Sequence, residues 1–344
     1  MEGVDLILYV SSQSSSLCSE SSTLSHASHC QQEPDLDRPT GGHLNICPDN
    51  LPSQTGHLLS NIKHELLHVL GFSVKLYAFF RDRAGNPRTR RRRDGRPPLH
   101  SKYFLHLADN TTVARLERRN WRVGGGGEVS KTVHMLVTPR VRREARRHFS
   151  CSRLEGGELE DQGDLGTSLT HWEKRVFGDE AMTGNHQELQ RAGRLYREQK
   201  MISRMTLAVL HDSGWYNVDF SKADRYTWGK NLGCDFVMKS CLEFMESHNR
   251  IQPYCVDQTA FTQRFSHEKI NKLNFPFLSI RKKKDCRKKD SLKFCNLVKF
   301  GEILPREFQN LPGTADREDL GRWGGGMWLA DFCPTEVTMI SESC

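Results

Sequence analysis

One short segment restricts the fold of this 344-residue chain more than any other. Residues 58–70 carry apolar side chains at helical spacing, namely Leu58, Leu59, Ile62, Leu66, Leu67, Val69 and Leu70. This spacing predicts a buried helix of about three turns that ends at Gly71. His64, Glu65 and His68 interrupt the apolar surface. Burying three such side chains without a ligand or partner would cost several kcal/mol, so the helix needs a compensating group.

A metal ion is one such group. Residues four apart share a helix face, so His64 and His68 can present ring nitrogens to one ion, and Glu65 can project beside them toward a metal-bound water. The pattern H-E-x-x-H is short and occurs on many helices by chance. The alternative is a pair of surface histidines with ordinary hydrogen-bond partners. The apolar surroundings favour the metal site.

A zinc hydrolase needs a third protein ligand and an open fourth position. In the short metzincin pattern, a glycine follows the second histidine and a further histidine stands three residues later. Gly71 is present, but the ligand position holds Val74, which cannot bind metal. The third ligand must therefore come from far along the chain. Spacing alone does not choose among His100, His106, His134, His148, His171, His186 and His211.

Composition indicates a soluble, folded protein. Hydrophobic residues make up 36% and charged residues 27% of the chain, and its length allows two or three domains. Eleven cysteines without a Cys-x-x-Cys pair favour disulfides and the secretory pathway, with reduced structural thiols as the alternative. The odd count leaves at least one thiol without an internal partner. The start, Met1 to Val10, has no basic region before its short apolar run, so a signal peptide would lie upstream.

Two basic runs, Arg88–Arg93 and Arg281–Lys289, supply much of the net charge of +8. They allow an alternative function, in which a basic protein binds nucleic acid or an anionic membrane surface. No nucleic-acid fold motif and no interleaved aromatic residues accompany the runs. Solvated loops are the usual meaning of such runs, so we expect no nucleic-acid partner.

The remaining pattern predicts a mixed α+β fold. Residues 4–10 favour a buried strand, and the Ser-rich stretch Ser11–Ser28 a loop. Asp82–Pro98 predicts an exposed loop, Gly124–Gly127 a break, Val133–Val137 a strand, and Pro139–Phe149 an amphipathic helix. Cysteines become frequent after Trp215, which suggests a separate disulfide-rich C-terminal domain.

Several segments resemble zinc peptidases of the leishmanolysin type, family M8, and are most similar to the animal leishmanolysin-like peptidases or invadolysins. Thr170–Arg175 followed by Asp179–Gly184 resembles the family's distant third-histidine segment and its Met-turn. The similarity spans roughly residues 4–335 and includes Ala27–Gln32, Leu36–Pro39, Asn45–Pro48, Val137–Val141, Leu154–Glu160, Asp212–Tyr216, Trp228–Gly229, Gly233–Val237, Lys239–Cys241 and Cys295–Phe300.

This resemblance implies a metzincin-like catalytic domain with a split zinc site. One Zn²⁺ per chain would be held by His64, His68 and His171, above Met182 as an apolar floor, and Glu65 would be the catalytic base of a metalloendopeptidase. The implied organisation has an N-terminal catalytic subdomain over 1–73 that ends in the zinc helix. A central region over 74–232 carries the third ligand and Met-turn, and a Cys-rich domain covers 233–344.

The resemblance also implies protein or peptide substrates, a role in cell adhesion or migration, and peripheral membrane association. Secreted, membrane-associated and intracellular forms are all expected of the family, whereas the chain shows no anchor. A non-catalytic relative that serves as an adhesion or scaffold protein is the alternative. The family's secretory signal and pro-segment do not lie in this chain, residues 185–200 look like extra polar material, and Val256–Lys293 matches the family poorly. These departures are expected of a fragment or of an imperfect gene model. Nothing indicates an oligomeric state.

Overall fold

The computed structural model describes residues 4–19, 23–51, 55–163, 166–184, 200–248, 253–254, 291–295, 297–311 and 321–340. Helices and strands are mixed along the chain, as the sequence predicts. Outside the described residues lie the basic run Arg281–Lys289, His186, and nearly all of the segments 185–200 and 256–293 that depart from the family pattern. Among the described residues, no helix is long and apolar enough to cross a bilayer.

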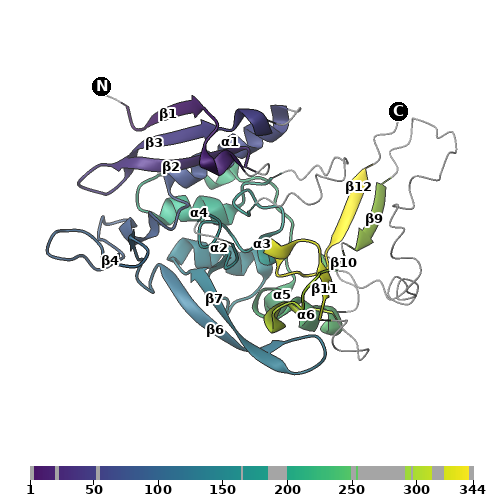
Figure 1. Ribbon diagram of the computed structural model, residues 1–344. Coiled ribbons are helices and arrows are strands. Elements are labelled where there is room, and N and C mark those ends of the chain that lie inside the picture. Colours follow the sequence, from purple (N-terminus) through teal and green to yellow (C-terminus); the bar gives the residue numbers. More distant parts are fainter. Residues whose placement is uncertain are drawn as a thin grey trace.

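A three-stranded sheet lies beside the predicted helix (Figure 1). Its strands β1 (Ile7–Ser12), β3 (Pro39–Ile46) and β2 (Ser25–Gln32) follow the order β1-β3-β2, with β1 parallel and β2 antiparallel to β3. Helix α1 (Thr55–Leu70) packs on β2 and β3. The approach is close, because a Cβ atom on Gly42 would lie 2.4 Å from Cγ1 of Val69. The predicted helix is therefore confirmed, with its start three residues earlier.

Two expectations for the N-terminal region are corrected. The strand begins at Ile7 rather than at residue 4, and Tyr9 and Val10 are exposed because β1 is an edge strand covered on one side. The Ser-rich stretch expected to be a loop contains the short helix η1 (Ser16–Ser19) and the start of β2. β2 reads Ser-His-Ala-Ser-His-Cys-Gln-Gln, which has no apolar alternation to signal a strand.

The central region confirms the other predicted elements. Strands β6 (Val113–Arg122), β7 (Glu128–Leu136) and β8 (Gly157–Leu159) form an antiparallel sheet, and Gly124–Gly127 lies in the turn between β6 and β7. Helix α2 has the expected bounds, Pro139–Phe149, and buries Val141, Ala145 and Phe149.

The other elements are short. The hairpin of β4 (Leu99–His100) and β5 (Leu105–His106) precedes β6. The later helices are α3 (Lys174–Phe177), α4 (Arg204–Asp212), α5 (Gly233–Met238) and α6 (Cys241–Ser247). The remaining strands form two pairs, β9 (Ser291–Cys295) with β12 (Glu336–Ile340) and β10 (Leu297–Lys299) with β11 (Trp323–Gly325).

The cysteines form disulfides, as predicted. Three bridges join Cys18 to Cys47, Cys151 to Cys234 and Cys241 to Cys333, while Cys30 is a free, exposed thiol. The Cys151–Cys234 bridge joins the loop after α2 to α5. It therefore crosses the expected domain boundary at residue 232. Buried side chains from both sides of that boundary contribute to one hydrophobic cluster. The domain boundaries at 73 and 232 remain a prediction.

The arginine-rich segment is only partly the solvated loop that the sequence suggests. Arg81 and Arg91 both donate to the Asp37 carboxylate, with nitrogen–oxygen distances of 2.8 and 2.9 Å. Arg88 donates through Nε to the backbone oxygen of Asp212 at 3.0 Å. These three side chains fasten the segment to the sheet and to α4, because each finds a partner inside the fold. Arg90, Arg92 and Arg93 remain exposed.

One buried carboxylate fixes the start of α2. Asp212 accepts hydrogen bonds from the backbone N–H groups of Arg140 (2.6 Å) and Val141 (3.1 Å), and the preceding Thr138 makes no side-chain cap. These N–H groups have no partner within the helix, and negative charge is favourable at a helix N-terminus.

We expect Asp212→Ala to lower the free energy of unfolding by about 1–3 kcal/mol, measured by chemical denaturation. An equal loss in Asp94→Ala, at an exposed turn, would contradict this role.

Candidate metal centre

Three histidine rings converge on one point inside the molecule. The Nε2 atom of His64 lies 3.0 Å from Nε2 of His68 and 3.1 Å from Nε2 of His171. His64 and His68 stand one turn apart on α1, whereas His171 comes from the loop before α3. His64 and His171 are nearly inaccessible to solvent. The structure thus brings together two residues that the sequence places four positions apart and a third that lies more than a hundred positions away.

Each ring is oriented by a hydrogen bond through its other nitrogen. The Nδ1 atoms of His64, His68 and His171 face the backbone oxygens of Ala181 (2.6 Å), Phe72 (2.7 Å) and Thr167 (3.0 Å). A carbonyl oxygen can only accept, so each Nδ1 carries the proton and donates it. Each Nε2 therefore presents a lone pair. This arrangement of imidazole, lone pair and outer carbonyl is the usual support of a metal-bound histidine.

A cation fits the three nitrogens, and a proton does not. Burial is the main cause that lowers the pKa of His171 to about 3 and of His68 to about 4, so both rings are neutral near pH 7. Three lone pairs at this separation repel one another unless a cation lies between them. Zinc–nitrogen bonds of 2.0–2.1 Å in tetrahedral geometry place ligand nitrogens about 3.3 Å apart, close to the observed spacing. The three histidines can hold a metal ion.

The segment that carries His171 is clamped on both sides. On one side, the N–H of Glu160, just beyond β8, donates to the backbone oxygen of His171 at 2.9 Å. On the other side, the N–H of Trp172 donates to the backbone oxygen of Met182 at 2.8 Å. Met182 is fully buried. The preceding residue, Ala181, is the one whose oxygen accepts from His64. The turn at Met182 therefore contacts the segment of His171 and orients the ring of His64 on α1.

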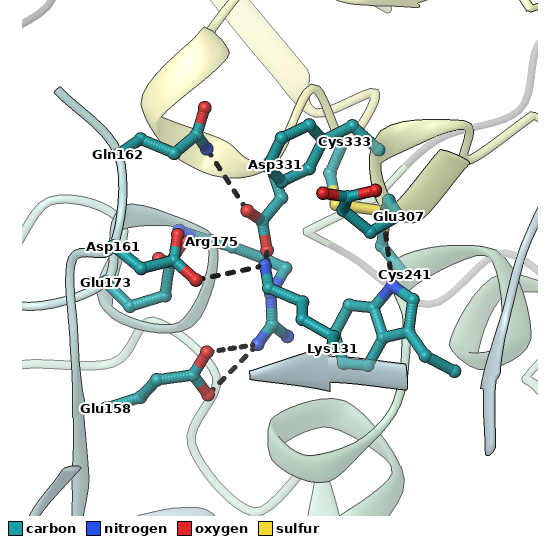
Figure 2. A network of polar contacts seen from close by, with 12 residues as sticks. Lys131, Glu158, Asp161, Gln162, Glu173, Arg175, Cys241, Glu307, Asp331 and Cys333 are labelled. Carbon is teal, nitrogen blue, oxygen red and sulfur yellow. Dashed lines mark hydrogen bonds and ion pairs between the residues drawn. A yellow bond between two sulfur atoms is a disulfide. The ribbon is translucent and has the colours of Figure 1, made fainter. Parts of the chain in front are cut away.

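A buried charge network holds the residues that follow His171 (Figure 2). The guanidinium of Arg175 donates to both carboxylate oxygens of Glu158 at 3.1 Å and to Asp331 at 3.0 Å. Lys131 on β7 pairs with the same Asp331, and the nearby disulfide Cys241–Cys333 fixes that segment. Sequence reasoning missed this network, because its members come from four separate stretches of the chain.

Glu65 lies on α1 beside His64 and faces β2. Its side chain is 6% exposed, and burial raises its pKa to about 8, although hydrogen bonds from the backbone of Ala27 and the side chain of Ser25 act in the opposite direction. Both partners belong to β2, an outer strand of its sheet. The sequence did not predict the contact between Glu65 and β2, because the start of β2 lies in the stretch Ser11–Ser28 that was expected to be a loop.

The other candidate histidines lie elsewhere in the fold. His148 faces the backbone oxygen of Trp228, His106 that of Pro97, and His211 the Asp212 carboxylate. His134 lies on β7, and His100 stacks on Tyr103. Among the described residues, none of these rings joins His64 and His68 in a cluster. Val74, at the position of the short metzincin ligand, packs against the core.

Sequence comparison agrees with this geometry. The family model described as leishmanolysin, peptidase M8, matches residues 1–344. This chain belongs to the leishmanolysin family. It is 44% identical over 345 residues to a leishmanolysin-like peptidase of Drosophila melanogaster, an alignment that covers 97% of this chain and 46% of the relative.

Two further relatives give the same result. A leishmanolysin-like peptidase of Caenorhabditis elegans is 44% identical over 348 residues, covering 97% of this chain and 48% of that protein. Leishmanolysin of Leishmania donovani is 30% identical over 244 residues, covering 71% of this chain and 32% of that protein. The chain spans about half the length of the Drosophila and Caenorhabditis relatives. For this member of the metal-dependent leishmanolysin family, the group of His64, His68 and His171 provides a site able to bind a metal.

The position of His171 generates a direct test. We expect His171→Ala to weaken metal binding by more than about a hundredfold, because even the outer partners of a metal ligand contribute 10- to 100-fold to affinity. The measurement is metal content per chain after dialysis against metal-buffered solution. His148→Ala should retain its metal, since His148 bonds to the Trp228 backbone. Loss of metal in His148→Ala with retention in His171→Ala would show that the ligand set is wrong.

Proposed function

We propose that this protein is a zinc-dependent metalloendopeptidase that hydrolyses peptide bonds in proteins. The observation that supports this most strongly is the convergence of three Nε2 lone pairs beside a buried carboxylate on the same helix. Membership of the leishmanolysin family points the same way. In this proposal His64, His68 and His171 are the ligands of one zinc ion per chain.

The donor set favours zinc. Three neutral imidazoles leave a fourth position free, and this arrangement is typical of catalytic zinc sites. When bound, zinc would polarise the substrate carbonyl and lower the pKa of a water toward about 7. Met182 would supply the apolar floor below the ligands, and its burial agrees with that role.

Glu65 is the proposed general base and acid. It would take the proton of the attacking water and deliver it to the nitrogen of the leaving amine. A carboxylate in a dry site holds a proton more readily than one in water, and burial raises the pKa of Glu65 in this direction. The hydrogen bonds from Ser25 and Ala27 would keep its side chain turned toward β2.

We propose that the substrate binds along the outer edge of strand β2. In the described sheet, β2 pairs with β3 on one side only, so its other edge can pair with an extended peptide. Glu65 contacts Ser25 and Ala27 of this strand, so a peptide bound there would pass the carboxylate. Backbone pairing of this kind depends little on the side chains of the substrate. The cleavage preference would therefore come from side-chain pockets along the strand.

A secreted or membrane-associated setting forms part of the proposal, together with an expected role in cell adhesion or migration. Three disulfides support an oxidising compartment, where such bonds persist. The alternative, a non-catalytic scaffold, would keep the metal and lack hydrolysis. The buried Glu65 beside the three oriented histidines favours catalysis, because a scaffold that keeps the metal does not need a general base.

Replacing Glu65 by glutamine separates catalysis from metal binding. We expect Glu65→Gln to retain one metal per chain and to lower the cleavage rate of an unfolded protein substrate by about 10²- to 10⁴-fold, because glutamine cannot accept the proton. Glu117→Gln, at an exposed position on β6, is the matched control and should keep the full rate. Full activity in Glu65→Gln with zinc bound would refute the assignment.

Metal removal tests the scaffold alternative. We expect a chelator to abolish cleavage of the same substrate and added zinc to restore it. Bound metal should also raise the thermal midpoint, since a ligand that binds only the folded state stabilises it in proportion to the logarithm of its concentration. A protein that gains stability from zinc yet cleaves no substrate at any zinc level would be the non-catalytic relative.

A further inference from the structure

We propose that the β4–β5 hairpin and the basic turn before it form a site that binds anionic phospholipid membranes. Four large apolar side chains of this hairpin are exposed to solvent. Phe104 is 80% exposed, and Leu99, Tyr103 and Leu107 are each between 44% and 47% exposed. We call these four residues the hairpin patch. Figure 1 places β4 at the periphery of the molecule.

The exposure of Phe104 is built into the backbone. Its φ angle is +52°, in the left-handed region that a bulky side chain rarely adopts. The N–H of Phe104 donates to the backbone oxygen of His100 at 2.9 Å and closes the turn. Glycine would adopt this φ angle without strain and would expose no apolar ring to water. A phenylalanine held in that conformation with its ring in solvent suits insertion into an apolar phase.

The base of the hairpin is fixed to the body of the protein. The Nδ1 atom of His106 donates to the backbone oxygen of Pro97 at 2.8 Å, because a carbonyl oxygen can only accept. The His106 ring also packs edge-on against Phe79, with 5.1 Å between the ring centroids. The N–H of Leu107 donates to the oxygen of Pro98 at 3.2 Å. Two two-residue strands alone would be marginal, so these contacts present the patch as a fixed protrusion.

Positive charge surrounds the patch. Residues 81–107 contain eight arginines and one lysine against two aspartates, a net charge of +7 in a chain whose total is +8. Arg81, Arg88 and Arg91 have partners inside the fold, as described above. Arg90, Arg93, Arg96 and Lys102 are exposed, and no carboxylate of the described residues forms an ion pair with them. The other two exposed arginines of this segment have partners: Arg92 pairs with Asp94, and Arg83 donates to His211.

Apolar side chains that protrude within a cationic belt match an anionic membrane interface. The apolar groups enter the boundary between headgroups and acyl chains, while the arginines and lysine remain at the level of the lipid phosphates. Nucleic acid fits less well, because Leu99 and Leu107 cannot stack on bases. This site is separate from the metal centre, so it does not depend on the proposed peptidase activity.

The test is co-sedimentation of the full chain with vesicles of phosphatidylcholine alone and of phosphatidylcholine mixed with phosphatidylserine. We expect binding to the mixed vesicles, little binding to the neutral ones, and weakening by salt. Phe104→Ser should reduce the partition coefficient about tenfold or more, since one aromatic side chain no longer enters the bilayer. The pair Arg90→Gln and Arg93→Gln should also reduce it about tenfold or more.

Matched controls lie on other elements. Tyr9→Ser removes an aromatic ring that is 59% exposed on β1, and Arg143→Gln removes an exposed cation on α2. Both should bind mixed vesicles like the unmodified protein, and all variants should melt at the same temperature. The proposal is overturned if mixed vesicles are not bound, or if the controls lose as much binding as the hairpin variants. Self-association that Phe104→Ser abolishes in the absence of lipid would also overturn it.

Discussion

The Nε2 atom of His64 lies about 3 Å from the Nε2 atoms of both His68 and His171, and neutral imidazole nitrogens at this spacing are stable neighbours when a cation lies between them. The packing around the three rings serves that requirement. Every ring has its second nitrogen bound to a backbone oxygen, so none can rotate without losing a buried hydrogen bond. The surrounding backbone thus aims the three lone pairs at one point. Rings held in this way reduce the cost of ordering the site on binding.

The rest of the fold can be understood as a frame for bringing the third histidine to the helix. α1 packs on the first sheet and presents two of the three histidines. The loop of His171 lies between β8 and the turn at Met182, and Arg175 anchors its far side through Glu158 and Asp331. Asp331 belongs to the C-terminal segment that the Cys241–Cys333 bridge fixes. The histidine cluster therefore depends on residues from near both ends of the described chain.

Charge is used in two different ways in this molecule. Inside, Arg175, Lys131 and their carboxylates are paired and exclude water, which makes them rigid supports. On the outside, the arginines of residues 88–96 divide into structural members that bind Asp37 or the Asp212 backbone and members that remain free. A run of like residues in the sequence gives no sign of this division, because it depends on which side chains find a partner in the folded protein.

The sequence by itself determined the local features. Helical periodicity located α1, Pro139–Phe149 formed the predicted α2, and four-residue spacing placed His64 and His68 on one face, because these depend on neighbours along the chain. The cysteine count indicated disulfides. Spacing could not choose His171 from seven histidines, and only the family resemblance selected it. Tertiary structure alone decided the carbonyl that orients each ring, the strand β2 facing Glu65, and the arginines that remain exposed, because these contacts join residues far apart in the chain.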